Sequence, residues 1–477
     1  MIAGSLLWAP RAWVGGAWAN AVLLRVDGQG CWAEITPDTP PPPHAHAHAH
    51  AHAHAQVLPG PVLPSLVNAH SHAFQRAFVG LAERRDSAHD DFWSWRDRMY
   101  GVALRITPEQ LQVVATQLYA ELLAGGYTQV CEFHYLQHAE DGKAYADEAA
   151  MSRALAAAAQ ATGIGLTLLP VLYERAGFQQ PALRADQRRF ATDVARVLRL
   201  RDAVRGWKLP NVNAGVAIHS LRAASAASIR DLAQQLRGDP GPIHIHIAEQ
   251  TGEVSDCLAA TGARPIEWLT RELPLDARWQ LVHATHATAD EINAVAATGA
   301  GVVLCPGTEA NLGDGLADLP RWLAAGVPLS LGSDSQVTRS WPEELRWLEY
   351  GQRLLLRQRN VAAEPGARRG TDAGTDPGAE PATAARLFER MRAGGAAAAG
   401  LAPWGLAVGA RADLLVLDAA QSALCGLPPS HLLDGLVFAA PERPFAKVMV
   451  AGLWVQSGSA PVPGFTAAMQ ALWQPSP

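Results

Sequence analysis

Along most of the chain, short apolar runs alternate with longer amphipathic stretches. Runs of this length, bounded by polar or turn-forming residues, are typical of buried strands. We expect strands over residues 62–70, 127–134, 165–172, 215–219, 243–248, 280–284, 301–304 and 327–333. Alanine- and leucine-rich segments between them predict helices over residues 108–124, 147–161, 188–204, 224–236 and 290–297. Strands separated by single helices pair in parallel, so this α/β pattern predicts a closed (β/α)8 TIM-like barrel.

An open, doubly wound sheet is the competing topology for the same alternation. Such folds often carry a glycine-rich G-x-G-x-x-G turn between a strand and the following helix, where it binds a dinucleotide. The chain has no such motif after any of the expected strands. The barrel is therefore the favoured fold, and its site is expected at the carboxyl ends of the strands.

The two ends of the chain have a different pattern. Residues 5–36 consist of short apolar stretches and turn residues, which indicates small strands and hairpins. After a helical segment over 382–400, strand-like runs return at 409–418 and 447–455. We expect these strands to form one small β-sandwich domain with the barrel inserted between its halves. The predicted boundaries are 1–60 and 403–477 for the small domain and 61–402 for the barrel.

Two segments interrupt this organisation. Residues 39–55 pass from four prolines into a strict His-Ala repeat. Such a repeat can chelate divalent metal weakly, but its composition favours an unstructured insertion, so its histidines are excluded from the search for a site. Residues 361–381, rich in Gly, Ala, Asp and Pro, are expected to form a loop or partly disordered linker.

Histidines and an aspartate recur at the carboxyl ends of the expected strands. They are His70 and His72 on the first strand, His219 on the fourth, His246 on the fifth, His283 on the sixth and Asp334 on the eighth. Alternate residues of a strand face the same side, so His70 and His72 point together. Three imidazoles and one carboxylate suit Zn²⁺, with Fe²⁺ as the alternative.

A single strand histidine is more often a buried core residue than a metal ligand, but the joint placement favours a site. His244 shares the parity of His246 and lies one step deeper, so we expect it to be a hydrogen-bonded core residue. His286 does not share the alternation of His283. Cys305 ends the seventh strand without an assigned base beside it, so we interpret it as a packing residue.

Composition and charge exclude several classes of function. The hydrophobic fraction of 49% is ordinary for a globular enzyme, and the net charge of −6 is spread along the chain, so neither nucleic acid nor an anionic membrane is an expected partner. No charged leader and no apolar run of about 20 residues is present, so we expect a cytoplasmic protein. Five scattered cysteines without a C-x-x-C pair indicate reduced thiols. A small-molecule substrate is the expected partner, and a homodimer is a candidate assembly.

Several stretches resemble one enzyme family. They are N-A-H-S-H-A-F-Q-R-A (68–77), E-F-H-Y (132–135), H-S-L-R (219–222), H-I-H-I-A-E-Q (244–250), C-P-G-T-E-A-N-L-G-D-G (305–315) and G-S-D-S-Q-V-T-R-S (332–340). The chain is similar to the amidohydrolase superfamily, in its branch of mononuclear-zinc deaminases. Within that branch it most resembles the formimidoylglutamate deiminases of histidine degradation. The similarity covers nearly the whole chain apart from the His-Ala run and the loop around 366–378.

The resemblance implies a site and a reaction. Zinc would be held by His70, His72, His246 and Asp334, with Glu249, His283 and Asp334 as the catalytic groups. The reaction would be the hydrolytic deimination of N-formimino-L-glutamate to N-formyl-L-glutamate and ammonia. Substrate contacts would come from Gln75, Arg96, Tyr135, His219 and Arg222, the two arginines suiting the two carboxylates of the substrate.

The resemblance also bears on the number of metal ions. Binuclear members of the superfamily usually carry a bridging lysine at the end of the fourth strand. The lysines here are Lys143, Lys208 and Lys447, and the fourth strand ends in His219. One zinc ion per site is therefore expected.

Two alternative functions stay open at this point. The same machinery could deaminate another amidine-like, purine, pyrimidine or guanidino compound, although such a site would have less need of two arginines. A non-enzymatic metal-binding or storage protein is the other class, suggested by the His-Ala run. Glu249 and His283 argue against storage, because holding a metal requires neither.

Overall fold

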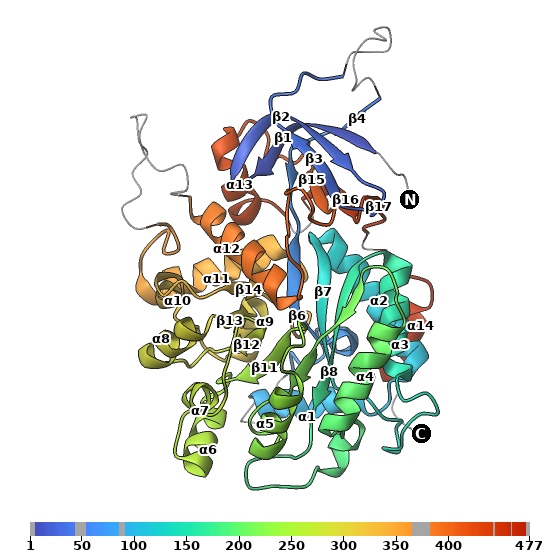
Figure 1. Cartoon of the computed structure of the whole chain (residues 1–477), viewed down its shortest axis with the longest axis vertical. Helices are drawn as coiled ribbons and strands as arrows, with labels where there is room; N and C mark the ends of the chain where they lie inside the picture. Colours follow the sequence, from blue (N-terminus) through green and yellow to red (C-terminus); the bar gives the residue numbers. More distant parts are fainter. Residues whose placement is uncertain are drawn as a thin grey trace.

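Parallel strands close into a barrel in the centre of the molecule (Figure 1). The structure is a computed structural model that describes residues 5–42, 54–84, 91–364, 382–441, 444–458 and 460–473. The barrel strands are β6 (Leu66–Ser71), β7 (Tyr127–His134), β8 (Gly165–Leu172), β10 (Val216–Ile218), β11 (Ile243–Ile247), β12 (Trp279–His283), β13 (Gly301–Leu304) and β14 (Leu329–Leu331). β10 pairs with both β8 and β11, which closes the ring, and β9 (Val212–Ala214) pairs with β8 alone. The predicted (β/α)8 fold class is confirmed.

Helices connect successive strands and cover the outside of the barrel. They are α2 (Pro108–Ala124), α3 (Ala150–Thr162), α4 (Val194–Gly206), α5 (Ala226–Gln235), α6 (Thr251–Thr261), α7 (Pro265–Glu272), α8 (Ala289–Thr298), α9 (Pro306–Leu312), α10 (Leu319–Ala324) and α11 (Trp341–Leu356). Capping boxes fix where two of them start, Thr107 with Gln110 for α2 and Thr288 with Glu291 for α8. The helix predicted over 188–204 is divided instead. A 3₁₀ turn, η2 (Ala185–Phe190), precedes α4, whose start is capped by Asp193.

Strands from both ends of the chain form a second sheet, which lies above the barrel in Figure 1. Its members are β1 (Leu6–Val14), β2 (Ala17–Val26), β3 (Trp32–Thr36), β4 (Gln56–Val57), β5 (Val62–Leu63), β15 (Leu414–Leu417), β16 (Phe445–Val450) and β17 (Leu453–Val455). β5 joins the two ends, because it pairs with β1 on one side and with β15 on the other. The strand predicted over 62–70 is thus two strands, β5 in the terminal sheet and β6 in the barrel.

Helix α12 (Thr383–Ala398) connects the terminal sheet to the barrel. It packs against β6 and β14, and a Cβ at Gly394 would lie 2.0 Å from the Leu329 carbonyl oxygen, so this close approach requires glycine. Carbonyl groups at its last turn accept hydrogen bonds from side chains of four strands. The donors are Cys131 (3.5 Å) and His244 (2.8 Å) to Ala398, and Thr167 (3.1 Å) and Asn213 (2.9 Å) to Ala399. His244 is therefore a buried, hydrogen-bonded core residue, as expected.

The remaining helices lie outside the alternation of barrel strands and helices, and α13 packs against α11 and α12. Helix α1 (Phe92–Ala103) and the 3₁₀ turn η1 (Ala73–Ala77) follow β6, α13 (Leu432–Phe438) follows the short turn η3 (Pro429–His431), and α14 (Phe465–Trp473) lies near the carboxyl terminus. α14 packs against α2, and the Trp473 indole donates to the Ala77 carbonyl (2.8 Å) while stacking on Phe78. The last helix thus supports the segment between η1 and α1.

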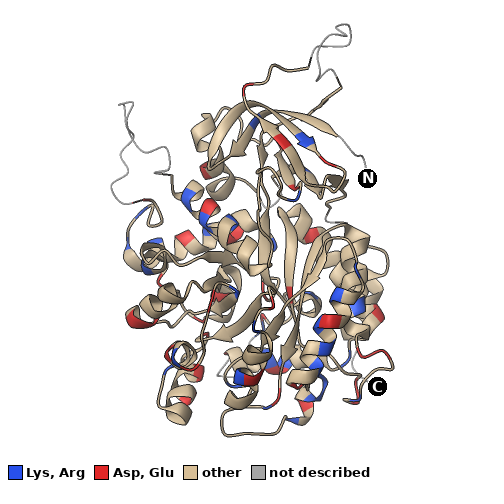
Figure 2. Cartoon of the chain, viewed as in Figure 1, with Lys and Arg blue, Asp and Glu red and all other residues tan. Residues whose placement is uncertain are grey.

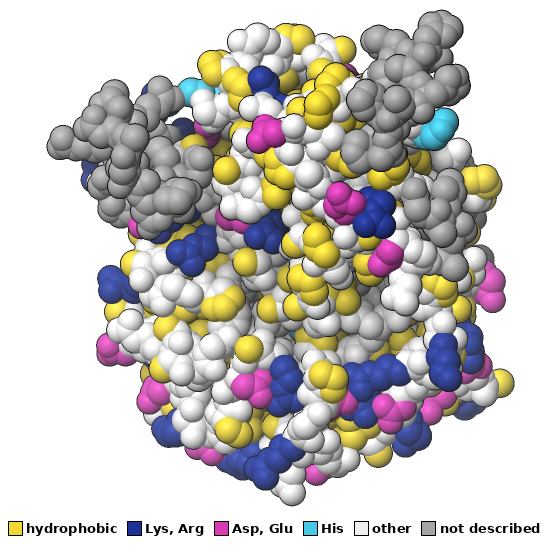
Figure 3. Space-filling view, turned by 45° about the horizontal axis from the view of Figure 1, so that its top comes forward, with side chains coloured by type: hydrophobic (Ala, Val, Ile, Leu, Met, Phe, Trp, Pro, Cys, Tyr) yellow, Lys and Arg dark blue, Asp and Glu magenta, His cyan; other side chains and the backbone are white. Residues whose placement is uncertain are grey.

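Charged side chains of both signs are interspersed over the outer helices (Figure 2). The face drawn in Figure 3 likewise shows basic and acidic groups next to one another, with no broad patch of one sign. Within the described part of the chain, no helix is both long and apolar enough to cross a membrane.

Candidate metal centre and substrate pocket

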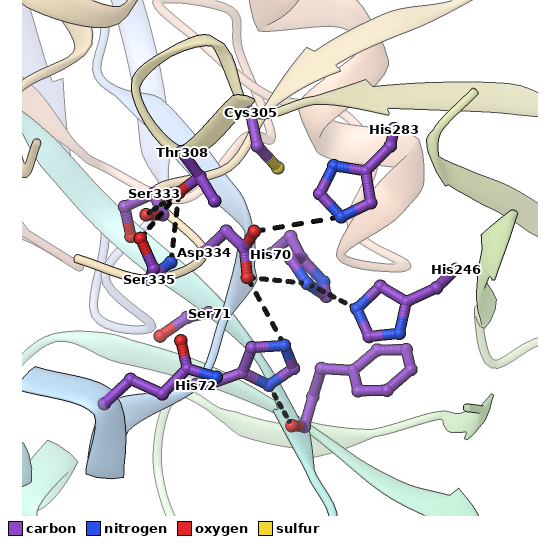
Figure 4. A network of polar contacts seen from close by, with 12 residues as sticks. His70, Ser71, His72, His246, His283, Cys305, Thr308, Ser333, Asp334 and Ser335 are labelled. Carbon is purple, nitrogen blue, oxygen red and sulfur yellow. Dashed lines mark hydrogen bonds and ion pairs between the residues drawn. The ribbon is translucent and has the colours of Figure 1, made fainter. Parts of the chain in front are cut away.

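The first two histidines and the aspartate are held together by adjacent strands. Asp334 follows β14, the barrel neighbour of β6, and its backbone N–H donates to the His70 carbonyl (3.0 Å). The His72 N–H in turn donates to the Asp334 carbonyl (3.3 Å). This short parallel bridge places the carboxylate between the two imidazoles (Figure 4).

Candidate ligand atoms form two groups that share His70, one with His72 and Asp334 and the other with His246 and His283. Three of the distances between them match the spacing of tetrahedral metal ligands. Oδ1 of Asp334 lies 3.4 Å from Nε2 of His70 and 3.4 Å from Nε2 of His72. Nε2 of His246 lies 3.0 Å from Nε2 of His70. Zinc with bonds of about 2.0–2.1 Å holds tetrahedral ligands about 3.3 Å apart. The donor set therefore fits a divalent cation that prefers nitrogen and oxygen ligands.

The outer nitrogens of two imidazoles fix which ring atom faces the centre. Nδ1 of His72 lies 2.8 Å from the Phe133 carbonyl oxygen, and Nδ1 of His246 lies 2.9 Å from the His219 carbonyl oxygen. A carbonyl can only accept, so each Nδ1 carries the proton and each Nε2 presents a lone pair to the centre. Burial lowers the pKa of His70, His72 and His246, which keeps the rings neutral as metal binding requires.

Glu249 and His283 lie on the other side of Asp334. Nε2 of His283 is 3.8 Å from Oε1 of Glu249 and 3.8 Å from Oδ2 of Asp334, while its Nδ1 is 3.4 Å from Oε1 of Glu309. Burial raises the pKa of Glu249 to about 8 against the opposing pull of His283. Burial alone would lower the pKa of His283, but Glu249, Cys305 and Glu309 raise it well above its usual value. Two titratable groups with raised pKa values thus lie together beside Asp334, where they can serve in proton transfer.

Strained backbone accompanies these residues. Ala248, His283, Ala284 and Asp334 have φ values of +52°, +70°, +48° and +44°, a region that residues other than glycine rarely adopt. All four lie where β11, β12 or β14 ends. Such conformations cost about 1–3 kcal/mol each and persist where the surrounding structure fixes them, often at functional sites.

One pocket opens onto this centre and brings together all the residues expected to contact substrate. It is lined by His72, His246, Glu249, His283 and Asp334, and also by Gln75, Arg96, Tyr135, His219 and Arg222. The Gln75 amide donates to the Tyr135 hydroxyl (3.2 Å). Among the described residues, Oε1 of Gln75 and Nε of Arg96 are buried without a hydrogen-bond partner. Both atoms belong to side chains that line the pocket, and neither has a partner among the described residues.

The two arginines reach the pocket from different parts of the fold. Arg96 lies on α1, stacked over Trp93 (4.6 Å) and Tyr100 (5.5 Å). Arg222 follows β10, with its guanidinium 5.8 Å from the same Trp93 ring and Nη1 donating to the Ala176 carbonyl (3.3 Å). Both guanidinium groups thus lie near the same indole ring and line one cavity.

Some pocket residues were not singled out from the sequence. Among them are Trp93, Tyr100, Tyr173, Gln250 and Glu253. The positions of two of them carried a signal, because Trp93 lies one helical turn before Arg96 and Glu253 lies four residues after Glu249. Tyr173 follows the last residue of β8, where site residues of barrels gather.

Other histidines are placed elsewhere. His134, His138 and His286 do not line the pocket, and His89 lies outside the described residues. Cys305 is fully buried but is not isolated, since its thiol contacts His283 and its sulfur lies near Asp334 (Figure 4). Burial raises the pKa of this thiol, so it carries no negative charge into the centre.

Known proteins with the same features were found by sequence and by structure. The amidohydrolase family model matches residues 62–455. Formimidoylglutamate deiminase of Pseudomonas aeruginosa is 45% identical over 452 residues, covering 94% of both chains. The 8-oxoguanine deaminase of the same organism is 28% identical and covers 64% of this chain and 65% of its own.

Solved structures have the same architecture. The crystal structure of an amidohydrolase from Brucella melitensis superposes with a TM-score of 0.87 and 38% identity, covering 98% of this chain and all of its own. An adenosine deaminase from Xanthomonas campestris, solved with bound zinc, gives a TM-score of 0.75 at 24% identity and covers 98% of this chain and 96% of its own, which shows the shared fold. From the family match over most of its length, the chain belongs to the amidohydrolase family.

Proposed function

We propose that this protein is a zinc-dependent deiminase that converts N-formimino-L-glutamate and water to N-formyl-L-glutamate and ammonia. The observation that carries the proposal is the pairing of two arginines with a His-His-His-Asp centre in one pocket. The 45% identity with a formimidoylglutamate deiminase over nearly the whole chain supports it.

His70, His72, His246 and Asp334 are the residues we propose to hold one zinc ion. When bound, the cation supplies Lewis-acid chemistry, lowering the pKa of water towards about 7. The neutral imidazoles and the Oδ1 atom of Asp334 provide the donors, and hydrogen bonds from Nδ1 of His72 and His246 fix two of the rings.

Proton transfer is assigned to the second group of residues. Oδ2 of Asp334 faces His283, so this carboxylate can accept a proton from the attacking water while the imidazole orients the oxygen. A raised pKa keeps Glu249 protonated at neutral pH, which suits a group that must give a proton to the leaving nitrogen. Ammonia then leaves, and the formimino carbon becomes a formyl group.

Substrate binding is assigned to the walls of the pocket. Formiminoglutamate carries two carboxylates, and Arg96 and Arg222 can each offer a guanidinium to one of them. Gln75, Tyr135 and His219 add polar contacts around the formimino group and the α-carboxylate. Burial and the adjacent Arg222 lower the pKa of His219, so it acts as a neutral hydrogen-bonding group.

A substrate panel tests this proposal. Purified, zinc-loaded protein is incubated with formiminoglutamate, adenosine, guanine, cytosine and a guanidino acid, and the released ammonia is measured. We expect turnover of formiminoglutamate with kcat/KM far above that of every other compound. Preference for a heterocycle would replace the substrate assignment, and no release from any compound by metal-replete protein would refute it.

A further inference from the structure

Glu253 contacts the backbone that carries the proposed proton carrier. It lies in the first turn of α6 and is only 6% exposed. Its Oε1 accepts from the Ala248 N–H (3.2 Å) and its Oε2 from the Glu249 N–H (3.0 Å). Both oxygens of one carboxylate are therefore used on two consecutive peptide groups.

Those two peptide groups form the turn that leaves the site. Ala248 has a φ of +52°, which alanine adopts only when neighbouring contacts hold it there. Glu249 is the next residue, and its carboxylate reaches Nε2 of His283 at 3.8 Å. If this turn changed its conformation, the Cα and Cβ atoms of Glu249 would move. The position of the Glu249 carboxylate therefore depends on the two hydrogen bonds that Glu253 accepts.

The same residue lines the pocket together with Arg222, the proposed carboxylate-binding arginine. Burial raises the pKa of Glu253, and the positive charge of Arg222 opposes that rise. Glu253 thus binds the backbone of Ala248 and Glu249 by hydrogen bonds and acts on Arg222 by its charge.

We propose that Glu253 is a positioning residue that fixes the Glu249 turn and moderates the affinity of Arg222 for the substrate carboxylate. The inference rests on the proposed deiminase function and adds a residue that affects both turnover and substrate binding. Glu253 does not touch the reacting atoms. It acts through Glu249 for turnover and through Arg222 for binding.

The two roles predict an unusual kinetic signature for Glu253→Gln. The amide group of glutamine cannot accept a hydrogen bond at its nitrogen, so one of the two N–H groups faces another donor and the turn shifts. A misplacement of about 1 Å can lower turnover by about 100-fold, and we expect kcat to fall by about 10- to 100-fold. Removing the negative charge beside Arg222 frees this arginine for substrate, so KM should stay unchanged or fall.

Glu291 provides a matched control. It also lies in the first turn of a helix that follows a barrel strand, and it is 4% exposed. Its carboxylate accepts from the Thr288 N–H (2.8 Å) and pairs with Arg264 (3.1 Å). It does not line the pocket. Glu291→Gln should lower the melting temperature while leaving kcat and KM near wild-type values.

The experiment measures kcat, KM, zinc content and melting temperature for wild type, Glu253→Gln, Glu253→Asp and Glu291→Gln. Aspartate keeps the charge beside Arg222, but its side chain is one methylene group shorter and its carboxylate cannot reach both N–H groups. Glu253→Asp should therefore lower kcat without lowering KM. Wild-type kcat in Glu253→Gln would overturn the positioning role, and a rise in KM would overturn the role at Arg222. Wild-type protein that releases no ammonia from formiminoglutamate would instead refute the proposed function.

Discussion

Replacing Arg222 by methionine tests whether the pocket recognises a substrate with two carboxylates. Arg222 lines the pocket, where its Nη1 donates to the Ala176 carbonyl (3.3 Å) and its guanidinium also interacts with the Tyr173 side chain. A guanidinium carries five N–H groups, so these two contacts leave donors for a carboxylate. Methionine has similar length and can fill the space, so the substitution removes the charge with little change in packing.

The expected magnitude follows from the loss of one partner of an enclosed charge pair. Leaving a carboxylate unpaired in such a site costs about 2–5 kcal/mol, which corresponds to about 30- to 5,000-fold in kcat/KM. Each arginine has an acidic neighbour, since Asp97 lies 3.3 Å from Nη2 of Arg96 and Glu253 lines the pocket with Arg222. Both Arg96→Met and Arg222→Met are therefore expected within this range.

The assay compares formiminoglutamate with N-formiminoglycine, which lacks the side-chain carboxylate. Wild type should strongly prefer formiminoglutamate, and one of the two arginine variants should lose this preference, with zinc content unchanged. Arg98→Met is the control, since Arg98 lies on the same helix but donates to the Ala82 carbonyl (3.0 Å) outside the pocket. If both Arg96→Met and Arg222→Met keep wild-type discrimination, neither arginine binds a substrate carboxylate.

Three further predictions concern the metal, the insertion and stability. Glu249→Gln should keep zinc but lose about 10²–10⁴-fold in kcat, whereas His246→Ala should lose zinc; metal analysis beside kinetics checks both, and near-normal turnover of zinc-loaded Glu249→Gln would contradict the proton route. Deleting residues 43–55 should leave kcat unchanged and one tightly bound zinc per chain, and two tightly bound ions in this variant would disprove a mononuclear site. Hydrogen bonds from Arg205 lower the pKa of Asp239 to about 2, so this carboxylate stabilises the fold above its usual pKa of 3.8, and the contribution is lost as the pH falls through 2. Urea unfolding of Asp239→Asn should show a loss of about 1 kcal/mol at pH 7 that shrinks towards pH 2, and a loss independent of pH would show that the ion pair is not its cause.

The barrel strands could be predicted because each is buried and most of their residues are apolar. β7, β8 and β13 begin and end at the predicted residues. The run that starts at Val62 shows the limit of this signal, because hydrophobicity alone does not say which sheet a residue joins. Pro64 separates β5 from β6 and cannot donate to a ladder, so the division had a local cause.

Site residues on strands were easier to identify than those on helices. His246 and His283 could be selected because strand ends of a barrel meet at one face. Trp93 and Tyr100 line the pocket from α1. The order of the strands does not predict where this helix lies. Glu253 was missed for another reason, since a glutamate in the first turn of a helix is also an ordinary capping residue.

The terminal sheet has a consequence for how the chain folds during synthesis. β1 and β5 are made early, but β5 pairs with β15, which begins at Leu414. A chain growing from its amino terminus therefore carries an unpaired strand edge until most of the barrel has been translated. Open edges of this kind can pair with other chains. Completion of the sheet is thus delayed until the last part of the polypeptide appears, and the ribosome-bound intermediate is the species most exposed to misassociation.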